Sequence, residues 1–477
     1  MSVEVRPVGV TCNLKCTYCY EESLREKQRV HRYDRDAVIA AVKTATEKWS
    51  LFGGEALLLP LPELEELLEL GFSRWGSTGV QTNGTLITDK HIDLFIKYQT
   101  YVGISLDGPD ELNDSRWAGT EAATRKATAK TLQAIDALLA RSVEHPHLVP
   151  SLILTLHAGN ASKERWPRLK EWLLALDAKG LKNINFHVME MDYEADKLFL
   201  PHQDLMDALR ELWELSTSFK NIKVLNFKEV IDLLRGDDSS ATCVWHACDP
   251  WNTAAVQGLE GDGSPSHCSR TNKDGIDWLP AEGVGMASKW QIGNFEGTRH
   301  HERQLSLYVT PQEDGGCQDC RFWLMCQGQC PGTGDESAPD SVGDWRLRSS
   351  YCETWKALFT EGEKRLKAIG ETPISLHPDR QQFEAIQYGA YSSNRECAMS
   401  TAIKIYRKEL TPDAIQNPPG HGDHTDQHGD AHGDHGDTTQ HQDVPHGDIE
   451  PEIHQDVPHG DIHHDSRGRH GDHVDKR

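Results

Sequence analysis

The sequence predicts an α/β protein made of a partial (β/α)6 TIM-like barrel, a Cys-rich, loop-rich region and a disordered C-terminal tail. Three observations support this prediction. Short apolar runs alternate with amphipathic stretches six times over residues 1–235, which is typical of parallel strands with covering helices. Residues 240–375 hold eight of the twelve cysteines but little hydrophobic periodicity. Residues 420–477 have almost no apolar side chains and cannot offset the entropy of folding.

Each predicted strand is a short apolar run, and each is followed by apolar residues at helical spacing. The predicted strands are residues 3–10, 49–52, 79–81, 102–106, 148–156 and 183–189. The predicted helices are residues 36–48, 61–70, 89–98, 121–141, 164–176 and 205–215. Pro62 lies in the first turn of its helix, where a missing N–H costs nothing. In such a barrel we expect the chemistry at the C-terminal ends of the strands.

Length and charge narrow the classes of function. The chain has 477 residues, so we expect several domains: 1–235, 240–375, a linker or leader-like recognition segment at 376–419, and the tail at 420–477. A net charge of −24 argues against nucleic acid as a partner. No apolar run approaches the roughly 20 residues that cross a bilayer, and the N-terminus has no secretory signal. We therefore expect a cytoplasmic protein with no membrane partner, whose cysteines are metal ligands or catalytic thiols.

Three cysteines, Cys12, Cys16 and Cys19, follow directly after the first predicted strand. Thiolates at this C-x3-C-x2-C spacing can hold one corner of a 4Fe–4S cluster from a single loop, which leaves one iron open. The alternative is a zinc knuckle with a remote fourth ligand. The position of the motif at the end of a barrel strand favours the cluster.

This motif, with Tyr18 before its third cysteine, resembles that of radical S-adenosylmethionine (radical SAM) enzymes. In that superfamily the open iron binds the amino and carboxylate groups of SAM, and the cluster cleaves SAM to a 5′-deoxyadenosyl radical. The resemblance implies that Cys12, Cys16 and Cys19 are the catalytic cluster ligands, and that a flavodoxin- or ferredoxin-type protein donates the electron. It also implies that Tyr18 lies against the adenine, with simple loop packing as the alternative.

Three further segments match the same superfamily in the expected order. Gly53-Gly54-Glu55 ends the second strand and resembles the motif that holds the SAM amino group. Gln81-Thr82-Asn83-Gly84 ends the third strand, and Ser105-Leu106-Asp107-Gly108 resembles the Ser-x-Asp-Gly segment near the SAM ribose. The residues expected to bind SAM are Tyr18, Gly53, Gly54, Glu55, Asn83, Ser105 and Asp107.

The cysteines of residues 240–375 resemble the SPASM extension of radical SAM peptide maturases. By resemblance to its sulfatase-maturing branch, they form two four-cysteine sites for auxiliary 4Fe–4S clusters, which gives three clusters in the chain. The first set is Cys243, Cys248, Cys268 and Cys330. The second set is Cys317, Cys320, Cys326 and Cys352. The alternative is two structural zinc sites, which the spacing does not exclude but which would accept no electrons.

One position departs from that branch. The sulfatase-maturing enzymes carry an Asp base directly after the third cysteine of the first set, where this chain has Ser269 followed by Arg270. The departure puts oxidation of Ser or Cys to formylglycine in doubt. Cys397 is left over and is expected to be an ordinary thiol.

The tail repeats one triplet. Twelve of its thirteen histidines begin a His-x-Asp triplet, and each of its twelve aspartates ends one. Seven triplets are His-Gly-Asp, and the unit HQDVPHGDI occurs at 441–449 and 454–462. SPASM proteins often modify ribosomally made (RiPP) peptides, and the cyclophane- or triceptide-forming type joins an aromatic ring to the β-carbon of the residue two positions later. Gly at the middle position suits a small ring.

The resemblance therefore predicts a peptide maturase that crosslinks the His ring to the Asp β-carbon in its own tail. Representative substrate residues are His446, Asp448, His459 and Asp461. A flexible segment of 44 residues at 376–419 would span roughly 36 Å and permit reaction in cis. Two alternatives remain open: another radical modification of the repeats, such as epimerisation or oxidation, or a metal-binding tail on a maturase that acts on a separate peptide or protein.

Overall fold

In a computed structural model of the chain, the described residues are 2–22, 25, 33–189, 197–248, 256–267, 270, 301–335 and 344–415. The expected ligand Cys268 and the neighbouring Ser269 lie outside them. So do the predicted tail at 420–477 and the representative substrate residues His446, Asp448, His459 and Asp461. None of the helices in the described ranges is long and apolar enough to cross a bilayer.

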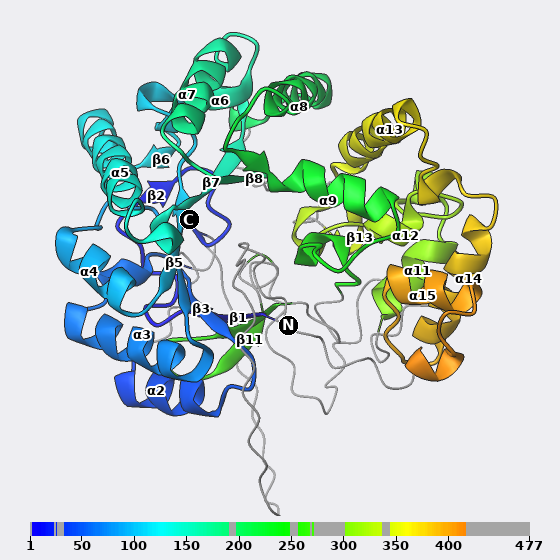
Figure 1. The fold of residues 1–477 in the computed structure, drawn as a ribbon, viewed down its shortest axis with the longest axis horizontal. Coiled ribbons are helices and arrows are strands. Elements are labelled where there is room, and N and C mark those ends of the chain that lie inside the picture. Colours follow the sequence, from blue (N-terminus) through cyan, green and yellow to red (C-terminus); the bar gives the residue numbers. More distant parts are fainter. Residues whose placement is uncertain are drawn as a thin grey trace, which may run out of the picture. The chain divides into compact units, whose positions relative to one another are not determined.

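A nine-stranded sheet forms the wall of the barrel, in the order β11-β10-β1-β3-β4-β5-β7-β8-β9 (Figure 1). Neighbouring strands run parallel except β10 and β11. The strands are β1 (Ser2–Val5), β3 (Trp49–Leu51), β4 (Thr78–Thr82), β5 (Thr100–Ser105), β7 (Ser151–Leu156), β8 (Asn183–Val188), β9 (Lys223–Val224), β10 (Val256–Leu259) and β11 (Pro265–His267). All six predicted strands lie side by side in chain order, so the partial α/β barrel is confirmed.

Two strands are shorter than predicted by three residues or more, and proline accounts for both. Strand β1 ends at Val5 because Pro7 has no N–H to give to a ladder and Gly9 turns the chain with φ 56°. Strand β7 begins at Ser151 because Pro146–Leu148 form a 3-10 turn and Pro150 directly precedes the strand.

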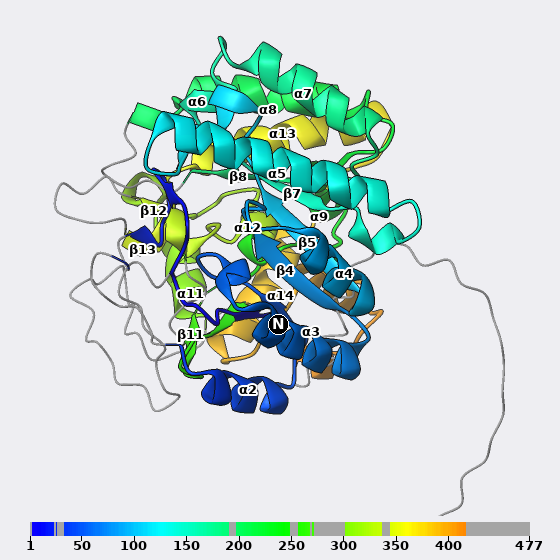
Figure 2. The ribbon, with the colours of Figure 1, turned by 90° about the vertical axis from the view of Figure 1, so that its left-hand side faces the viewer.

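Helices cover the outer face of the sheet, as Figures 1 and 2 show for α3, α4 and α5. The barrel helices are α2 (Arg35–Thr44), α3 (Leu61–Trp75), α4 (Asp89–Lys97), α5 (Glu121–Arg141), α7 (Trp166–Ala178), α8 (His202–Ser216) and α9 (Leu225–Leu234). Local signals set their ends. The Asp34 carboxylate accepts a hydrogen bond from the Ala37 N–H at 3.0 Å at the start of α2, and Gly76 ends α3 at φ 71°.

Strands β10 and β11 come from the region predicted to lie beyond the barrel, yet they complete its edge. Ser2 of β1 pairs with Val256 of β10. The buried Arg6 guanidinium donates to Ser266 Oγ at 2.6 Å and lies 3.1 Å from Glu260 Oε1. The predicted domain boundary near residue 240 therefore does not coincide with the end of the barrel sheet, because residues beyond it contribute two strands.

The helices and strands that follow β11 pack on one side of the barrel. They are α11 (Glu302–Val309), α12 (Trp323–Cys326), β12 (Gly334–Asp335), β13 (Asp344–Ser349), α13 (Cys352–Ala368), α14 (Arg380–Ser392) and α15 (Met399–Tyr406). Helix α13 contacts α8 and α9, and a Cβ at its Gly362 would lie 2.6 Å from Leu234 Cδ1. This close approach joins the two regions in one hydrophobic core.

Residues 380–415, within the segment expected as a linker or recognition element, are folded. Helix α14 contacts α11, α12 and α15, and the Phe383 side chain is fully buried in the main core. A short 3-10 turn, Pro412–Ile415, ends the described chain. A tether to the tail would therefore begin after Ile415.

Candidate functional site

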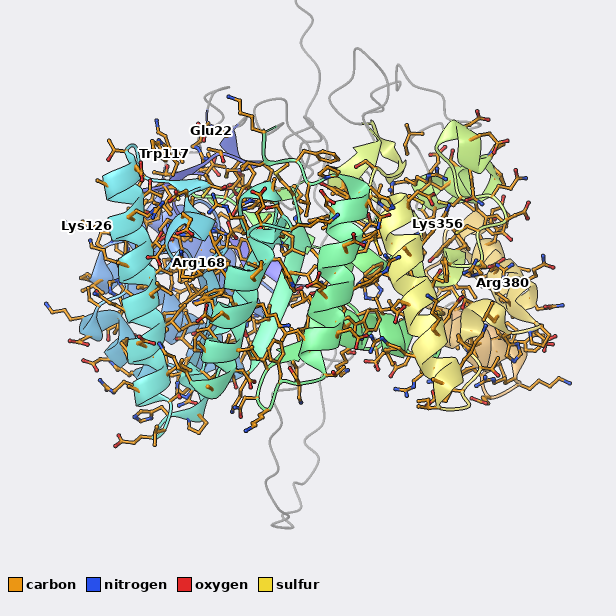
Figure 3. All side chains as sticks on the ribbon, turned by 90° about the horizontal axis from the view of Figure 1, so that it is seen from above. Glu22, Trp117, Lys126, Arg168, Lys356 and Arg380 are labelled. Carbon is orange, nitrogen blue, oxygen red and sulfur yellow. The ribbon has the colours of Figure 1, made fainter. Side chains whose placement is uncertain are left out.

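The loop after β1 brings Cys12, Cys16 and Cys19 together. The short strand β2 (Lys15–Cys16) pairs with β6 (Arg116–Trp117), and the Cys19 N–H donates to the Cys16 carbonyl at 3.0 Å. Burial raises the pKa of Cys12 to about 11, and the neighbouring Cys19 thiolate adds to the effect. Burial also raises the pKa of Cys16, with contributions from both other thiols. Figure 3 labels Trp117 of β6 and, nearby, Glu22, which follows Cys19 in the chain.

Two guanidinium groups lie close to these thiols. Arg116 lowers the pKa of Cys16 and Arg25 lowers that of Cys19, each against the larger effect of burial. Arg25 is held in place by its hydrogen bond to the Val10 carbonyl at 2.9 Å. Three soft thiolates beside two cations suit an anionic iron–sulfur cluster, because thiolates are the usual ligands of such clusters. The residues present therefore fit the expected cluster.

Gly53 and Gly54 let the chain after β3 pack closely against the backbone of the cysteine loop. The Gly54 N–H donates to the Gly9 carbonyl at 2.8 Å, and the Glu55 N–H donates to the Thr11 carbonyl at 2.9 Å. A Cβ at Gly54 would lie 2.2 Å from the Thr11 oxygen, and Gly53 has φ 106°. The two glycines let strand β3 approach the backbone that carries Cys12.

Glu55 and Asn83 tie the strand ends to that loop. The Glu55 side chain is fully buried and accepts hydrogen bonds from Thr82 Oγ1 at 2.7 Å and from the Asn83 N–H at 2.8 Å. Asn83 Nδ2 donates to Asn13 Oδ1 at 2.8 Å and lies 3.8 Å from Cys12 Sγ. The Glu55 carboxylate thus holds β3 to β4 from within the protein. Its expected contact with SAM remains a prediction.

Asp107 is the centre of a buried polar group at the end of β5. Arg116 donates to it twice, at 2.9 and 3.1 Å, and Tyr18 Oη donates a short hydrogen bond. The Thr155 N–H donates at 3.0 Å, and His157 Nε2 lies 3.5 Å away. Burial alone would raise the pKa of Asp107, but Arg116 and His157 hold it well below its usual range. The half-buried Tyr18 ring also lies against the His157 ring, with centroids 5.4 Å apart and planes tilted by 40°.

Ser105 lies on the inner face of the barrel, where Gln81 Nε2 donates to its Oγ at 2.8 Å. Strand alternation puts Val102 and Ile104 against the helices and Gly103 and Ser105 toward the interior. The interior near the strand ends is therefore polar, as a binding site for a polar cofactor requires.

Four polar residues of this site were not predicted from the sequence: Arg25, Arg116, His157 and His187. Two of them carry a signal that was available. His157 directly follows β7 and His187 lies near the end of β8, where catalytic residues of barrels gather. Arg25 and Arg116 belong to no motif and reach the site only through folding.

The second cysteine set borders one cavity. Cys317, Cys320, Cys326 and Cys352 all line it. Burial raises the pKa of Cys317 to about 12, and the neighbouring thiolates Cys320 and Cys352 contribute. The structure thus brings together the four thiols that the resemblance grouped.

Buried hydrogen-bond donors without protein partners surround the same cavity. Among the residues that the structure describes, Gln329 Nε2, Trp323 Nε1 and Trp355 Nε1 are buried and have no acceptor. All three residues line the cavity, as do the cations Arg348 and Lys356, the latter labelled on α13 in Figure 3. A buried donor without an acceptor is costly. Donors and cations at a four-thiol cavity fit an anionic, sulfide-bearing 4Fe–4S cluster.

No three His, Cys, Asp or Glu side chains within the described ranges are arranged to hold a single metal ion. The four thiols are spaced around a cavity instead.

The first auxiliary set is described only in part. Cys243 begins a 3-10 turn, Cys248 follows it, and Cys330 is buried ahead of another turn, Pro331–Thr333. The Cys248 carbonyl accepts a hydrogen bond from Gln304 Nε2 at 3.1 Å. Because Cys268 lies outside the described residues, convergence of this set remains a prediction. Cys397 is buried within a small cluster with Ala390, Ala402 and Ile415.

Comparison with known proteins relates the chain to one superfamily and one group of enzymes. Residues 7–162 match the radical SAM superfamily. A cysteine-type anaerobic sulfatase-maturating enzyme from Clostridium perfringens (strain 13 / Type A) is 27% identical over 404 residues, covering 77% of this chain and 97% of the relative. A serine-type anaerobic sulfatase-maturating enzyme from Bacteroides thetaiotaomicron is 32% identical over 156 residues, covering 30% of this chain and 37% of the relative.

A solved structure shares the fold over the same length. Native anSMEcpe with bound AdoMet has a TM-score of 0.54 and 19% sequence identity, covering 77% of this chain and 98% of that chain. The similarity supports the barrel and the region packed beside it as one common architecture.

Proposed function

We propose that this enzyme, which carries a radical SAM domain at residues 7–162, is a peptide maturase. Its proposed substrate is its own C-terminal tail. One observation carries the choice of substrate: every aspartate of the tail follows a histidine by two positions, twelve times out of twelve. Solubility or metal storage would tolerate a scrambled order, whereas a crosslinking reaction requires fixed spacing. The similarity to sulfatase-maturating enzymes supports a polypeptide substrate.

Cys12, Cys16 and Cys19 would hold the SAM-binding cluster. The residues Tyr18, Gly53, Gly54, Glu55, Asn83, Ser105 and Asp107 would position SAM beside it, directly or through their neighbours. When bound, the cluster and SAM supply a 5′-deoxyadenosyl radical, which removes a hydrogen atom from a substrate. An external flavodoxin- or ferredoxin-type protein would deliver the electron. The auxiliary cysteine sets would hold two more clusters, three in all, and these would accept an electron from the substrate.

The proposed reaction removes two hydrogens from each triplet. A hydrogen atom leaves the Asp β-carbon, and the resulting carbon radical forms a C–C bond to a carbon of the neutral His ring. The ring then loses a proton to a base and an electron to an auxiliary cluster. The product is a three-residue ring that joins the imidazole to the Asp β-carbon.

Reaction in cis is consistent with the length of chain after the last described residue. His446 follows Ile415 by 31 residues, which can span at most about 100 Å when fully extended. That reach exceeds the diameter of a compact domain of this size. A tail on the same chain would also have an effective concentration far above that of a free peptide.

The test is tandem mass spectrometry of the tail after anaerobic expression with iron–sulfur assembly. We expect a loss of two hydrogens per modified triplet and no fragmentation inside it. Asp448→Ala should abolish the crosslink at His446 and leave the matched triplet His459–Asp461 unchanged. Insertion of one glycine before Asp448 should also abolish it.

Each alternative gives a different result. Epimerisation leaves the mass unchanged, and oxidation adds oxygen. A metal-binding tail predicts an unaltered mass and a graded loss of bound metal as histidines are removed, with little dependence on His-to-Asp spacing. An unmodified tail from a chain that forms 5′-deoxyadenosine would contradict the cis proposal and favour a separate peptide or protein as substrate.

A further inference from the structure

Two cations from different elements line the cavity of the second cysteine set. Arg348 lies near the end of β13, and Lys356 lies one turn after Cys352, which begins α13. Arg348 Nη1 donates to the Gly316 carbonyl at 2.9 Å, and Gly316 directly precedes Cys317 in the chain. Each cation is therefore held beside the backbone that carries one of the four thiols.

The charge on the lining of this cavity has one sign. No Asp or Glu of the described chain lines the cavity, whereas Arg348 and Lys356 both do. Burial raises the pKa of Cys352, and the two cations lower it. The opposing carboxylate is Glu353, which accepts a hydrogen bond from Lys356 Nζ at 2.9 Å, but its side chain is 63% exposed and water screens its charge. A group bound among the four thiols would therefore face net positive charge.

A buried amide adds hydrogen-bond donors to the same lining. The Gln329 Oε1 atom accepts a hydrogen bond from the Cys330 N–H at 2.8 Å, which holds the side chain in place. Its Nε2 is buried and has no acceptor in the part of the chain that the structure describes. A buried donor without an acceptor is costly, and a sulfur atom of a bound cluster would supply one.

We propose that Arg348, Lys356 and Gln329 raise the reduction potential of the 4Fe–4S cluster held by the second cysteine set. This inference rests on the proposed function, in which an auxiliary cluster accepts an electron from the substrate. Reduction adds one electron, and therefore one negative charge, to the cluster. Nearby cations and N–H donors stabilise the reduced form more than the oxidised form. The three side chains thus act through the cluster and determine how readily it takes up that electron.

The test is a redox titration of the anaerobically reconstituted full chain, followed by electron paramagnetic resonance. Dithionite and redox mediators set the potential, and the signal of each reduced cluster gives its midpoint potential. The signal of the second auxiliary cluster is the one that Cys352→Ala removes, which assigns it before the other variants are compared. Iron content and circular dichroism of each variant show that its clusters and its fold are retained.

We expect replacement of both cations, Arg348→Gln together with Lys356→Gln, to lower the equilibrium constant for reduction of this cluster about tenfold. For a one-electron couple, that change is a fall of about 59 mV in midpoint potential. Each single substitution should give a smaller fall. Arg348→Lys should keep most of the potential because the charge stays. Glu353→Gln should raise the potential because it removes the opposing charge.

Gln329→Met tests the amide donor, because methionine is similar in length but has no N–H. The midpoint potential should fall in this variant as well, since a hydrogen bond to the cluster is lost. Lys364→Gln is the matched control for the cation on α13. Lys364 lies on the same helix, is 68% exposed, pairs with Glu361 at 3.5 Å and does not line the cavity. Its replacement should leave the midpoint potential unchanged.

Three results would overturn the proposal. One is an unchanged midpoint potential in the double cation variant or in Gln329→Met, with normal iron content. Another is an equal fall in Lys364→Gln, which would assign the effect to the net charge of the chain instead of the cavity lining. The third is that Cys352→Ala removes no signal, because this cavity would then hold no cluster. An uncrosslinked tail would contradict the proposed function and leave the shifts in potential standing.

Discussion

Asp107 and Arg116 form an ion pair from which water is excluded. The Asp107 side chain is fully buried and that of Arg116 is 9% exposed, and two hydrogen bonds of 2.9 and 3.1 Å join them. The pair links the end of β5 to β6, and β6 pairs with the strand that carries Cys16. The position of the cysteine loop therefore depends on a buried charge pair that lies outside the cysteine motif.

Asp107→Asn should destabilise the protein by about 3–5 kcal/mol, because it leaves the Arg116 charge buried without a counter-ion. The measurement is anaerobic urea unfolding followed by tryptophan fluorescence. Asp110→Asn is the control: Asp110 is exposed and pairs with Arg168, and loss of an exposed pair costs at most about 1 kcal/mol. Equal effects of the two substitutions would contradict the argument.

Gly54→Ala should reduce the iron bound by the first cysteine site. The added Cβ would lie 2.2 Å from the Thr11 oxygen, and backbone on both sides must shift to admit it. Gly389→Ala on α14 is the matched control, because a Cβ there meets no atom within 4 Å. Iron analysis and electron paramagnetic resonance of the reduced protein with SAM would measure the loss. A normal SAM-responsive signal in Gly54→Ala would show that the contact between residue 54 and the Thr11 backbone tolerates a methyl group.

The features that could be predicted from the sequence are local ones. The cysteine loop after β1 and the helix at Glu121–Arg141 follow from motif spacing, helix propensity and periodicity, all of which act within a few residues. The chain order of the six strands follows from alternation with helices. The grouping of the second cysteine set is implied by the resemblance to the SPASM extension, and the structure adds a common cavity to it.

The features that could not be predicted depend on contacts between distant segments. Strand β10 is a four-residue run that pairs with the first strand of the chain across about 250 positions. Arg270 meets His187 only because the chain after β11 returns to the barrel. No periodicity or motif encodes either contact. Glu55 is predicted at the cofactor from its motif, but its hydrogen bonds from Thr82 at the end of β4 and from Asn83 just after it could not be predicted.

Cys352→Ala should remove about four irons from an expected total of roughly twelve, because it takes away one of the four thiols at the second auxiliary cavity. Cys397→Ala is the control, since that thiol is buried more completely than Cys352 and lies in a small hydrophobic cluster of its own. Iron and zinc analysis of anaerobically reconstituted protein measures both variants. Stoichiometric zinc with only four irons would contradict the three-cluster proposal.

Glu229 on α9 gives a prediction about pH. Its carboxylate accepts hydrogen bonds from Trp245 Nε1 at 2.9 Å and from the Thr242 N–H and Oγ1 at 3.2 Å, in a buried position between α9 and the turn that begins at Cys243. Burial raises the pKa of Glu229 from 4.5 to about 7, and the hydrogen bonds only partly offset it. Folding therefore favours the neutral form of this side chain.

Between pH 4.5 and 7 the folded chain keeps a proton on Glu229 that the unfolded chain has lost. The stability that the neutral group contributes is therefore fully present below about pH 4.5 and is lost as pH rises through 7, at up to about 1.4 kcal/mol per pH unit. Glu229→Gln is neutral at every pH and keeps an acceptor for Trp245. The unfolding free energy of the variant, measured by anaerobic urea titration at pH 5, 6, 7 and 8, should rise relative to that of the unsubstituted chain as pH increases. If the difference in unfolding free energy between the two proteins is the same at all four pH values, the prediction is wrong. Burial of Glu229 would then carry no energetic cost, and its carboxylate would be charged in the folded protein.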